Sequence, residues 1–170
     1  MRNHNGMRPQ DVAILLKIIV KGNQNWQYKD LASELYLSPA EISLSLQRSA
    51  EAGLINSEKK KVHRQTLTEF IQYGLHVVFP VTPGGIVNGL YTAHSHPFMQ
   101  QYFASENAYV WPDVTGKDRG QSILPLYKDI VKAAILDAEL YKILALLDIV
   151  RVGKVRELKI AMEELYKLLK

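Results

Sequence analysis

The order of hydrophobic and polar positions predicts a mainly α-helical first half of the chain. Hydrophobic side chains recur there every three or four residues, which is the spacing of an amphipathic helix. This pattern predicts helices over residues 9–21, 28–35, 38–53 and 65–73. Pro9 suits the first turn of the first helix, and Gly22 suits its C-terminal end.

The helix that follows Ser38 carries the clearest start signal. Ser38 is a favourable N-cap, Pro39 fits the first helical position, and Glu41 completes the spacing of a capping box. The small side chain of Ala32 allows the preceding helix to cross this one closely. The turn between the two helices holds Tyr36, where glycine is usual because φ is positive. Tyr36 therefore indicates either a strained turn or a different turn geometry.

A basic stretch lies between the third helix and the fourth. It contains three lysines, a histidine and an arginine within residues 58–64. Leu54 and Ile55 precede the lysines and Val62 follows them. This order favours a strand, a tight basic turn and a second strand, which together form a small β wing.

The second half of the chain is less regular. The sequence of residues 76–81 predicts an extended segment. Pro83, Gly84, Gly85 and Gly89 predict turns over residues 82–90. Mostly loop is expected over residues 91–121, with a short helix at 97–103. Helical spacing returns over residues 125–136, 138–152 and 155–169, with Asp137 as a cap and Gly153 as a break. Asp148 is interpreted as a surface residue of its helix.

This pattern divides the chain into three parts. Residues 1–8 are expected to be loose, residues 9–74 to form a winged helix-turn-helix, and residues 75–170 to form a C-terminal α-rich lobe with extended and loop segments. The predicted fold class is therefore mainly α with a small β wing.

Composition narrows the classes of function. The 170 residues contain no cysteine, which excludes disulfides, thiolate zinc sites and cysteine nucleophiles. The apolar run at residues 12–20 is interrupted by Lys17 and is too short to span a bilayer, and no signal peptide is recognised. We therefore expect a cytoplasmic protein without a membrane partner. The net charge of +4 favours a polyanionic partner such as nucleic acid.

Residues 31–43, together with Gln47, Arg48 and residues 52–55, resemble the winged-helix core of the MarR-type regulators. Segments further along resemble a small group of bacterial helix-turn-helix proteins regarded as transcriptional regulators, some of them antitoxin-like. These segments are residues 74–75, 78–80, 92–94, 110–112, 119–121, 144–151 and 156–157. The resemblance implies a bacterial transcriptional regulator that binds double-stranded DNA, as a homodimer because operators are two-fold.

The usual docking of such a motif assigns roles to its residues. The helix after Ser38 enters the major groove with its outward side chains, which are Ser38, Ala40, Ser43, Leu44, Gln47 and Arg48. Gln47 suits adenine and Arg48 suits guanine or a phosphate. The expected phosphate contacts are Lys59, Lys60, Lys61, His63 and Arg64.

Other functions were weighed against DNA binding. The same three-helix core occurs in protein–protein interaction modules, so the alternative is an antitoxin-like protein that binds a partner protein. The apolar stripe at residues 155–169 is a candidate dimer interface. His94 and His96 have the spacing of two metal ligands, but two ordinary loop histidines explain them better. We recognise no catalytic constellation, phosphate loop or metal set, and expect no enzyme activity and no cofactor.

Overall fold

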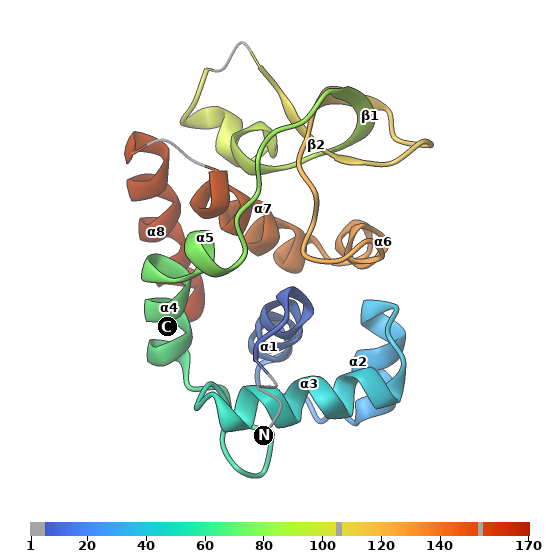
Figure 1. The fold of residues 1–170 in the computed structure, drawn as a ribbon, viewed down its shortest axis with the longest axis vertical. Coiled ribbons are helices and arrows are strands. Elements are labelled where there is room, and N and C mark those ends of the chain that lie inside the picture. Colours follow the sequence, from blue (N-terminus) through green and yellow to red (C-terminus); the bar gives the residue numbers. More distant parts are fainter. Residues whose placement is uncertain (1–5, 105–106, 153–154) are drawn as a thin grey trace.

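The computed structural model describes residues 6–104, 107–152 and 155–170 (Figure 1). These residues form a mainly helical protein with a small three-stranded sheet. The helices are α1 (Pro9–Lys21), α2 (Tyr28–Leu35), α3 (Pro39–Glu51), α4 (Arg64–Tyr73), α5 (Leu75–Val78), α6 (Ile130–Ile135), α7 (Ala138–Val152) and α8 (Val155–Leu169). The strands are β1 (Ile86–Tyr91), β2 (Tyr109–Pro112) and β3 (Asp118–Ser122), and two short 3₁₀ helices are η1 (Ala93–Ser95) and η2 (Met99–Gln101).

Helix α1 lies at the centre of the helical layer (Figure 1). Its residues 11–19 are all buried, because it packs against α2 and α3 on one side and against α7 on the other. This environment explains why its sequence is apolar on nearly every face. The predicted bounds of α1 and α2 are confirmed, and α3 begins after Ser38 as expected.

The sheet is the main feature that the sequence analysis missed. Strand β1 pairs antiparallel with both β2 and β3, and β2 and β3 pair parallel with each other, so that the sheet closes on itself. The expectation of mostly loop over residues 91–121 is therefore wrong. Such a narrow closed sheet brings backbones close together, and glycines make this possible. A Cβ atom at Gly89 would lie 1.9 Å from the carbonyl oxygen of Trp111, and one at Gly120 would lie 2.5 Å from that of Ala108.

Two further predictions of local structure differ from the structure, and two others fall on residues that it does not describe. Residues 75–78 form the short helix α5, so the predicted extended segment at 76–81 begins with a helical turn. Helix α6 covers only Ile130–Ile135 of the predicted 125–136. The expected break at Gly153 and most of the expected loose N-terminus lie outside the described residues.

A buried carboxylate ties the sheet to the helices. Asp148 accepts hydrogen bonds from Thr92 Oγ1 at 2.7 Å, from Trp111 Nε1 at 2.6 Å and from Arg151 Nη1 at 2.9 Å. Its interpretation as a surface residue is wrong, because only 2% of it is exposed. Asp137, by contrast, does cap α7, since its Oδ1 accepts a hydrogen bond from Leu140 N at 3.0 Å.

The two sequence regions share one hydrophobic core. A single cluster of buried side chains extends from Val12 in α1 through Leu67 in α4 to Leu165 in α8, and includes Trp111 of the sheet. Helix α4 packs against both α7 and α8. None of the helices in the described part of the chain is long and apolar enough to cross a membrane.

Candidate nucleic-acid interface

The turn between α2 and α3 is tight because Tyr36 adopts a left-handed conformation. Its φ is 56° and its ψ is 40°, and the next residue, Leu37, donates its N–H to Ala32 O at 3.0 Å. A non-glycine residue with positive φ costs about 1–2 kcal/mol. Of the two geometries considered for Tyr36, the structure therefore has the strained one.

A complete capping box fixes the start of α3. Glu41 N donates to Ser38 Oγ at 3.1 Å, and Ser38 N donates to Glu41 Oε2 at 2.9 Å. Both groups are exposed, so the first turn of α3 is well ordered and accessible at the same time. This arrangement confirms the predicted N-cap and holds the N-terminus of α3 at the surface.

Helix α3 has one buried face and one exposed face. Ile42 and Leu46 are fully buried. The opposite face consists of Ala40, Leu44 and Gln47, which are exposed, and Ser43, which is half-buried. Leu44 is 57% exposed although it is a large apolar residue in the middle of a helix. The core therefore does not account for the presence of leucine at this position.

Arg48 is not part of the exposed face, and its predicted role as a base or phosphate contact is wrong. Its side chain is 3% exposed, and its Nε and Nη2 donate to the two carboxylate oxygens of Asp11 at 2.8 and 2.6 Å. Ser45 Oγ donates to the same carboxylate at 2.6 Å. Asp11 is completely buried, so this cluster joins α1 to α3 inside the protein. Spacing along the chain could not predict this contact, because Asp11 lies 37 residues before Arg48.

The basic segment after α3 is a compact turn, which we call the basic turn (residues 56–61). Asn56 Oδ1 accepts hydrogen bonds from the N–H groups of Lys60 and Lys61, both at 2.9 Å, and Lys59 has a positive φ of 58°. The predicted pair of strands around this turn is reduced to one bridge between Ile55 and Val62. Asn56 thus takes over hydrogen bonds that a longer hairpin would provide.

The basic side chains of this segment differ in their partners. Lys60 Nζ donates to Trp26 O at 2.9 Å and lies 3.8 Å from the centre of the Trp26 ring. His63 Nδ1 donates to Gly53 O at 2.7 Å, and Arg64 Nη1 donates to Lys170 O at 2.5 Å. Within the described residues, no ion pair or side-chain hydrogen bond engages Lys59 or Lys61. These two lysines are therefore the predicted phosphate contacts with unengaged ammonium groups.

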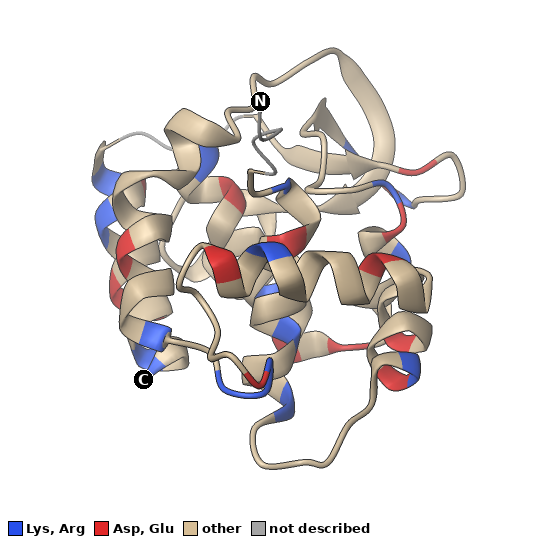
Figure 2. Cartoon of the chain, turned by 60° about the horizontal axis from the view of Figure 1, so that its bottom comes forward, with Lys and Arg blue, Asp and Glu red and all other residues tan. Residues whose placement is uncertain are grey.

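The basic turn and α3 lie on the same face of the molecule (Figures 1 and 2). Lysines follow one another along the turn, whereas acidic residues lie near the two ends of α3 (Figure 2). Gln47 Nε2 donates to Glu51 Oε1 at 2.9 Å, so an acidic neighbour holds the amide of Gln47. Lys29 was missed by the sequence analysis, yet it lines a shallow polar hollow together with Trp26 and Lys60.

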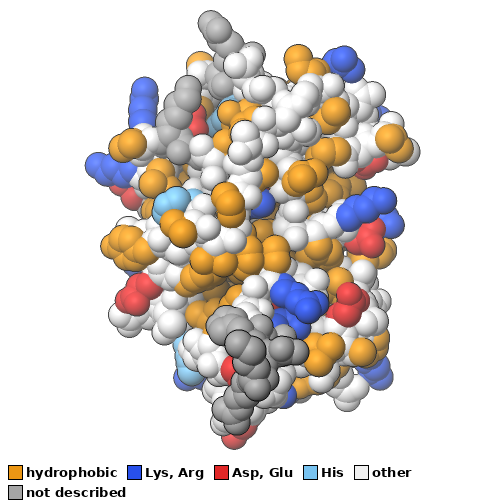
Figure 3. Space-filling model, viewed as in Figure 1, with side chains coloured by type: hydrophobic (Ala, Val, Ile, Leu, Met, Phe, Trp, Pro, Cys, Tyr) orange, Lys and Arg blue, Asp and Glu red, His pale blue; other side chains and the backbone are white. Residues whose placement is uncertain are grey.

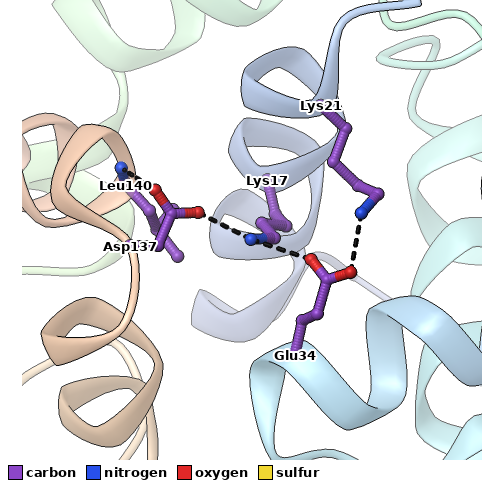
Figure 4. A network of polar contacts seen from close by, with 5 residues as sticks. All are labelled: Lys17, Lys21, Glu34, Asp137 and Leu140. Carbon is purple, nitrogen blue, oxygen red and sulfur yellow. Dashed lines mark hydrogen bonds and ion pairs between the residues drawn. The ribbon is translucent and has the colours of Figure 1, made fainter. Parts of the chain in front are cut away.

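An ion-pair network supports α2 from behind this face (Figure 4). Lys17 of α1 lies 2.9 Å from Glu34 of α2 and 2.6 Å from Asp137 at the start of α7, and Lys21 lies 2.7 Å from Glu34. Burial by itself raises the pKa of Asp137 and of Glu34. The hydrogen bonds that each carboxyl accepts and the positive charges of the lysines together outweigh burial, so the pKa of each carboxyl lies below its ordinary value. The network therefore holds both carboxyls ionised between the helices.

The two candidate metal-ligating histidines are structural. His94 Nε2 donates to Asn107 O at 2.7 Å, and His96 Nδ1 accepts from Phe98 N at 3.1 Å. Both are buried rather than in an exposed loop. Burial, together with the nearby charge of Lys142, lowers the pKa of His96 to about 4. No group of three or more potential ligands is placed to hold a metal ion in the part of the chain that the structure describes.

Comparison of the chain with protein-family models, with curated proteins and with solved structures finds no match. The geometry of α2, α3 and the basic turn therefore carries the functional argument by itself.

Proposed function

We propose that this protein binds double-stranded DNA as a winged helix-turn-helix transcriptional regulator, with α3 in the major groove and the basic turn on the phosphate backbone. The observation that carries the proposal is the exposed, capped helix α3, followed after its C-terminal end by a turn that carries free lysines. A helix presented in this way fits the major groove, and lysines beside it fit the adjoining phosphates.

The proposed contacts differ from those that the sequence alone predicts. Ser43, Leu44 and Gln47 read the bases, with Leu44 against a thymine methyl group and Gln47 on adenine. Ser38 and Ala40 lie where α3 approaches the sugar-phosphate backbone of the DNA. Lys59, Lys61 and Lys29 contact phosphates. Lys60 instead holds the basic turn against Trp26. Arg48 takes no part, because Asp11 holds it inside the protein.

The test compares two glutamines in the same local arrangement. Gln47 on α3 donates to Glu51, and Gln65 on α4 donates to Glu69 at 3.0 Å with the same spacing. Sites are first selected from a random DNA pool, and binding is then measured to the selected site and to a scrambled duplex. Gln47→Ala is expected to lose about 1–3 kcal/mol of discrimination between them, as for a lost base contact. Gln65→Ala is expected to keep the wild-type discrimination between the two duplexes. Equal behaviour of the two variants contradicts the assignment of α3.

A second surface favours self-association, and we propose that it forms a homodimer. Exposed apolar side chains on α4, α5 and α8 are Tyr73, Val77, Val78 and Val155. Figure 3 shows apolar side chains gathered across the middle of this face. A groove between α4 and α8 lies beside them and is lined by Leu158 and Met162. A two-fold dimer is the assembly that matches a palindromic DNA site.

Light scattering after size exclusion tests the dimer. The wild-type protein is expected to elute at twice its chain mass, and Val77→Asp combined with Val155→Asp at the mass of one chain. Val114→Asp is the matched control, because Val114 is an exposed valine in the segment between β2 and β3. A monomeric wild-type protein, or a monomeric Val114→Asp variant, contradicts this interface. The antitoxin-like alternative instead predicts that this surface binds a different protein.

A further inference from the structure

A pocket of about 760 Å³ opens between the sheet and the segment that leads into α6. Its apolar wall is formed by Val87, Pro112, Val114 and Val131. Its cationic side chains are Arg119, Lys128 and Lys132. At the edge of the molecule where α6 lies, basic and acidic side chains adjoin apolar ones (Figure 3). A concave site with an apolar wall and a few charged groups has the usual make-up of a small-molecule site.

The charges in this pocket leave positive groups available for an anion. One oxygen of Asp113 already accepts hydrogen bonds from Thr115 N and Thr115 Oγ1, at 2.9 and 2.8 Å. Asp129 pairs with Lys132 at 3.1 Å. Arg119 uses Nη1 for Asn88 Oδ1 at 3.1 Å, and a guanidinium has five N–H donors. Within the described residues, Lys128 has no ion-pair partner.

The chemistry of the wall indicates the body of the ligand. The apolar lining consists of three valines and a proline, and no aromatic ring is among the lining residues that the structure describes. An aliphatic chain therefore fits this wall better than a planar ring, which would find no stacking partner. A bare inorganic anion would leave the apolar wall uncovered.

The side of the pocket that carries Lys132 lies near the turn before α3, and Tyr127, the neighbour of the lining residue Lys128, contacts the end of α2. Tyr127 OH donates to Leu35 O at 2.8 Å, at the last residue of α2. Lys132 Nζ lies 5.7 Å from the centre of the Tyr36 ring. Tyr36 is the residue that holds the strained left-handed turn. Lys132 thus belongs both to the pocket and to the surroundings of that turn.

We propose that this pocket binds a small aliphatic carboxylate, and that the bound carboxylate draws Lys132 away from Tyr36 and so loosens the turn between α2 and α3. The carboxylate lies against Arg119, Lys128 and Lys132, and the aliphatic chain lies on the valines. Binding and its effect on the turn do not depend on DNA. Any effect on DNA affinity rests on the proposed function.

Calorimetric titration of the full chain with octanoate tests the binding. Saturable binding of octanoate at one site is expected. Octanamide lacks the negative charge and inorganic phosphate lacks the aliphatic chain, so each is expected to bind at least about tenfold more weakly. Lys128→Gln is expected to weaken octanoate binding about tenfold. Lys117→Gln, an exposed lysine outside the pocket, is expected to leave it unchanged. The proposal is overturned if octanoate does not bind detectably. It is also overturned if octanamide or phosphate binds as tightly as octanoate, or if Lys128→Gln binds octanoate as tightly as the wild-type protein does.

Hydrogen exchange of the amide of Leu37 tests the link to the turn. Its hydrogen bond to Ala32 O closes that turn. Saturation with octanoate is expected to speed exchange of this amide severalfold, while the amides inside α8 keep their rates. Unchanged exchange at Leu37 in the saturated protein overturns the link. Because this measurement contains no DNA, a failure of the DNA-binding proposal does not affect it.

Discussion

At the scale of single residues, the contact with the largest consequence for function is the ion pair between Arg48 and Asp11. Arg48 is the basic residue of α3, and the ion pair withdraws it from the exposed face of the helix. The pair joins α3 to α1 instead. Such a buried pair fixes the orientation of α3 on the core. The face that remains is polar and apolar rather than basic, which suits base reading more than phosphate binding.

Substitution of Arg48 separates the structural role from a role in DNA binding. Arg48→Met leaves the carboxylate of Asp11 buried without its ionic partner, and an uncompensated buried charge costs about 3–5 kcal/mol. Urea unfolding is expected to show that loss in the free energy of unfolding. The double variant Asp11→Leu with Arg48→Met is expected to lose less than the single one. An Arg48→Met protein of unchanged stability but weakened DNA binding contradicts this assignment.

Asp148 gives a second prediction at this scale. Asp148→Ala leaves the donors of Thr92 and Trp111 and the charge of Arg151 without their common acceptor, so a loss of about 3–5 kcal/mol is expected in urea unfolding. Asp148→Asn keeps an acceptor oxygen and is expected to lose less. Glu139→Ala, at an exposed position on the same helix, serves as the control. Equal stability of Asp148→Ala and Glu139→Ala contradicts the role of Asp148 as the link between sheet and α7.

At the scale of elements, most helices were predictable from the sequence, whereas the short helix α5, the bounds of α6 and the sheet were not. The bounds of α1, α2, α7 and α8 follow from hydrophobic spacing, because each presents a long apolar face to one core. The strands are short, and their glycines look like turn signals, as at Gly89 and Gly120. These glycines are required by the close approach of three backbones, which depends on contacts between distant segments. The burial of Arg48 and the contact of Lys60 with Trp26 also depend on contacts between distant segments, so the sequence did not predict them.

The ion-pair network of Lys17 gives a prediction about the packing of elements at low pH. The pKa of Glu34 and of Asp137 lies below the ordinary value in the folded protein. Their contribution is therefore present above the unfolded pKa, and it is lost as the pH falls through the folded pKa. The free energy of unfolding is expected to decline from about pH 5 downwards.

Lys17→Met provides the comparison for this decline. Without Lys17 the two carboxyls have pKa values closer to ordinary ones, so urea unfolding between about pH 5 and pH 3 should show a shallower decline than in the wild type. Lys29→Met, an exposed lysine outside the network, should keep the wild-type slope. Parallel pH profiles for wild type and Lys17→Met contradict the network as the source of the effect.

At the scale of the whole molecule, one continuous core joins the proposed DNA-binding face to the lobe that carries the pocket and the sheet. Helix α1 contacts both α3 and α7, and Asp137 of the lobe reaches Lys17 of α1. The first region therefore does not pack as an independent unit. The lobe therefore contacts α1 directly, and the proposed carboxylate site acts through a separate contact, between Lys132 and Tyr36.

The measurement that tests the central claim most directly is the salt dependence of binding to a random-sequence duplex, followed by fluorescence anisotropy. The wild-type affinity is expected to fall steeply with salt. Lys59→Ala with Lys61→Ala should make the slope of log K against log salt shallower by about 1.8, as for two lost phosphate contacts. Lys117→Ala with Arg156→Ala removes the same charge elsewhere and should leave the slope unchanged. Salt-insensitive wild-type binding, or the same slope change in both double variants, contradicts DNA binding through α3 and the basic turn.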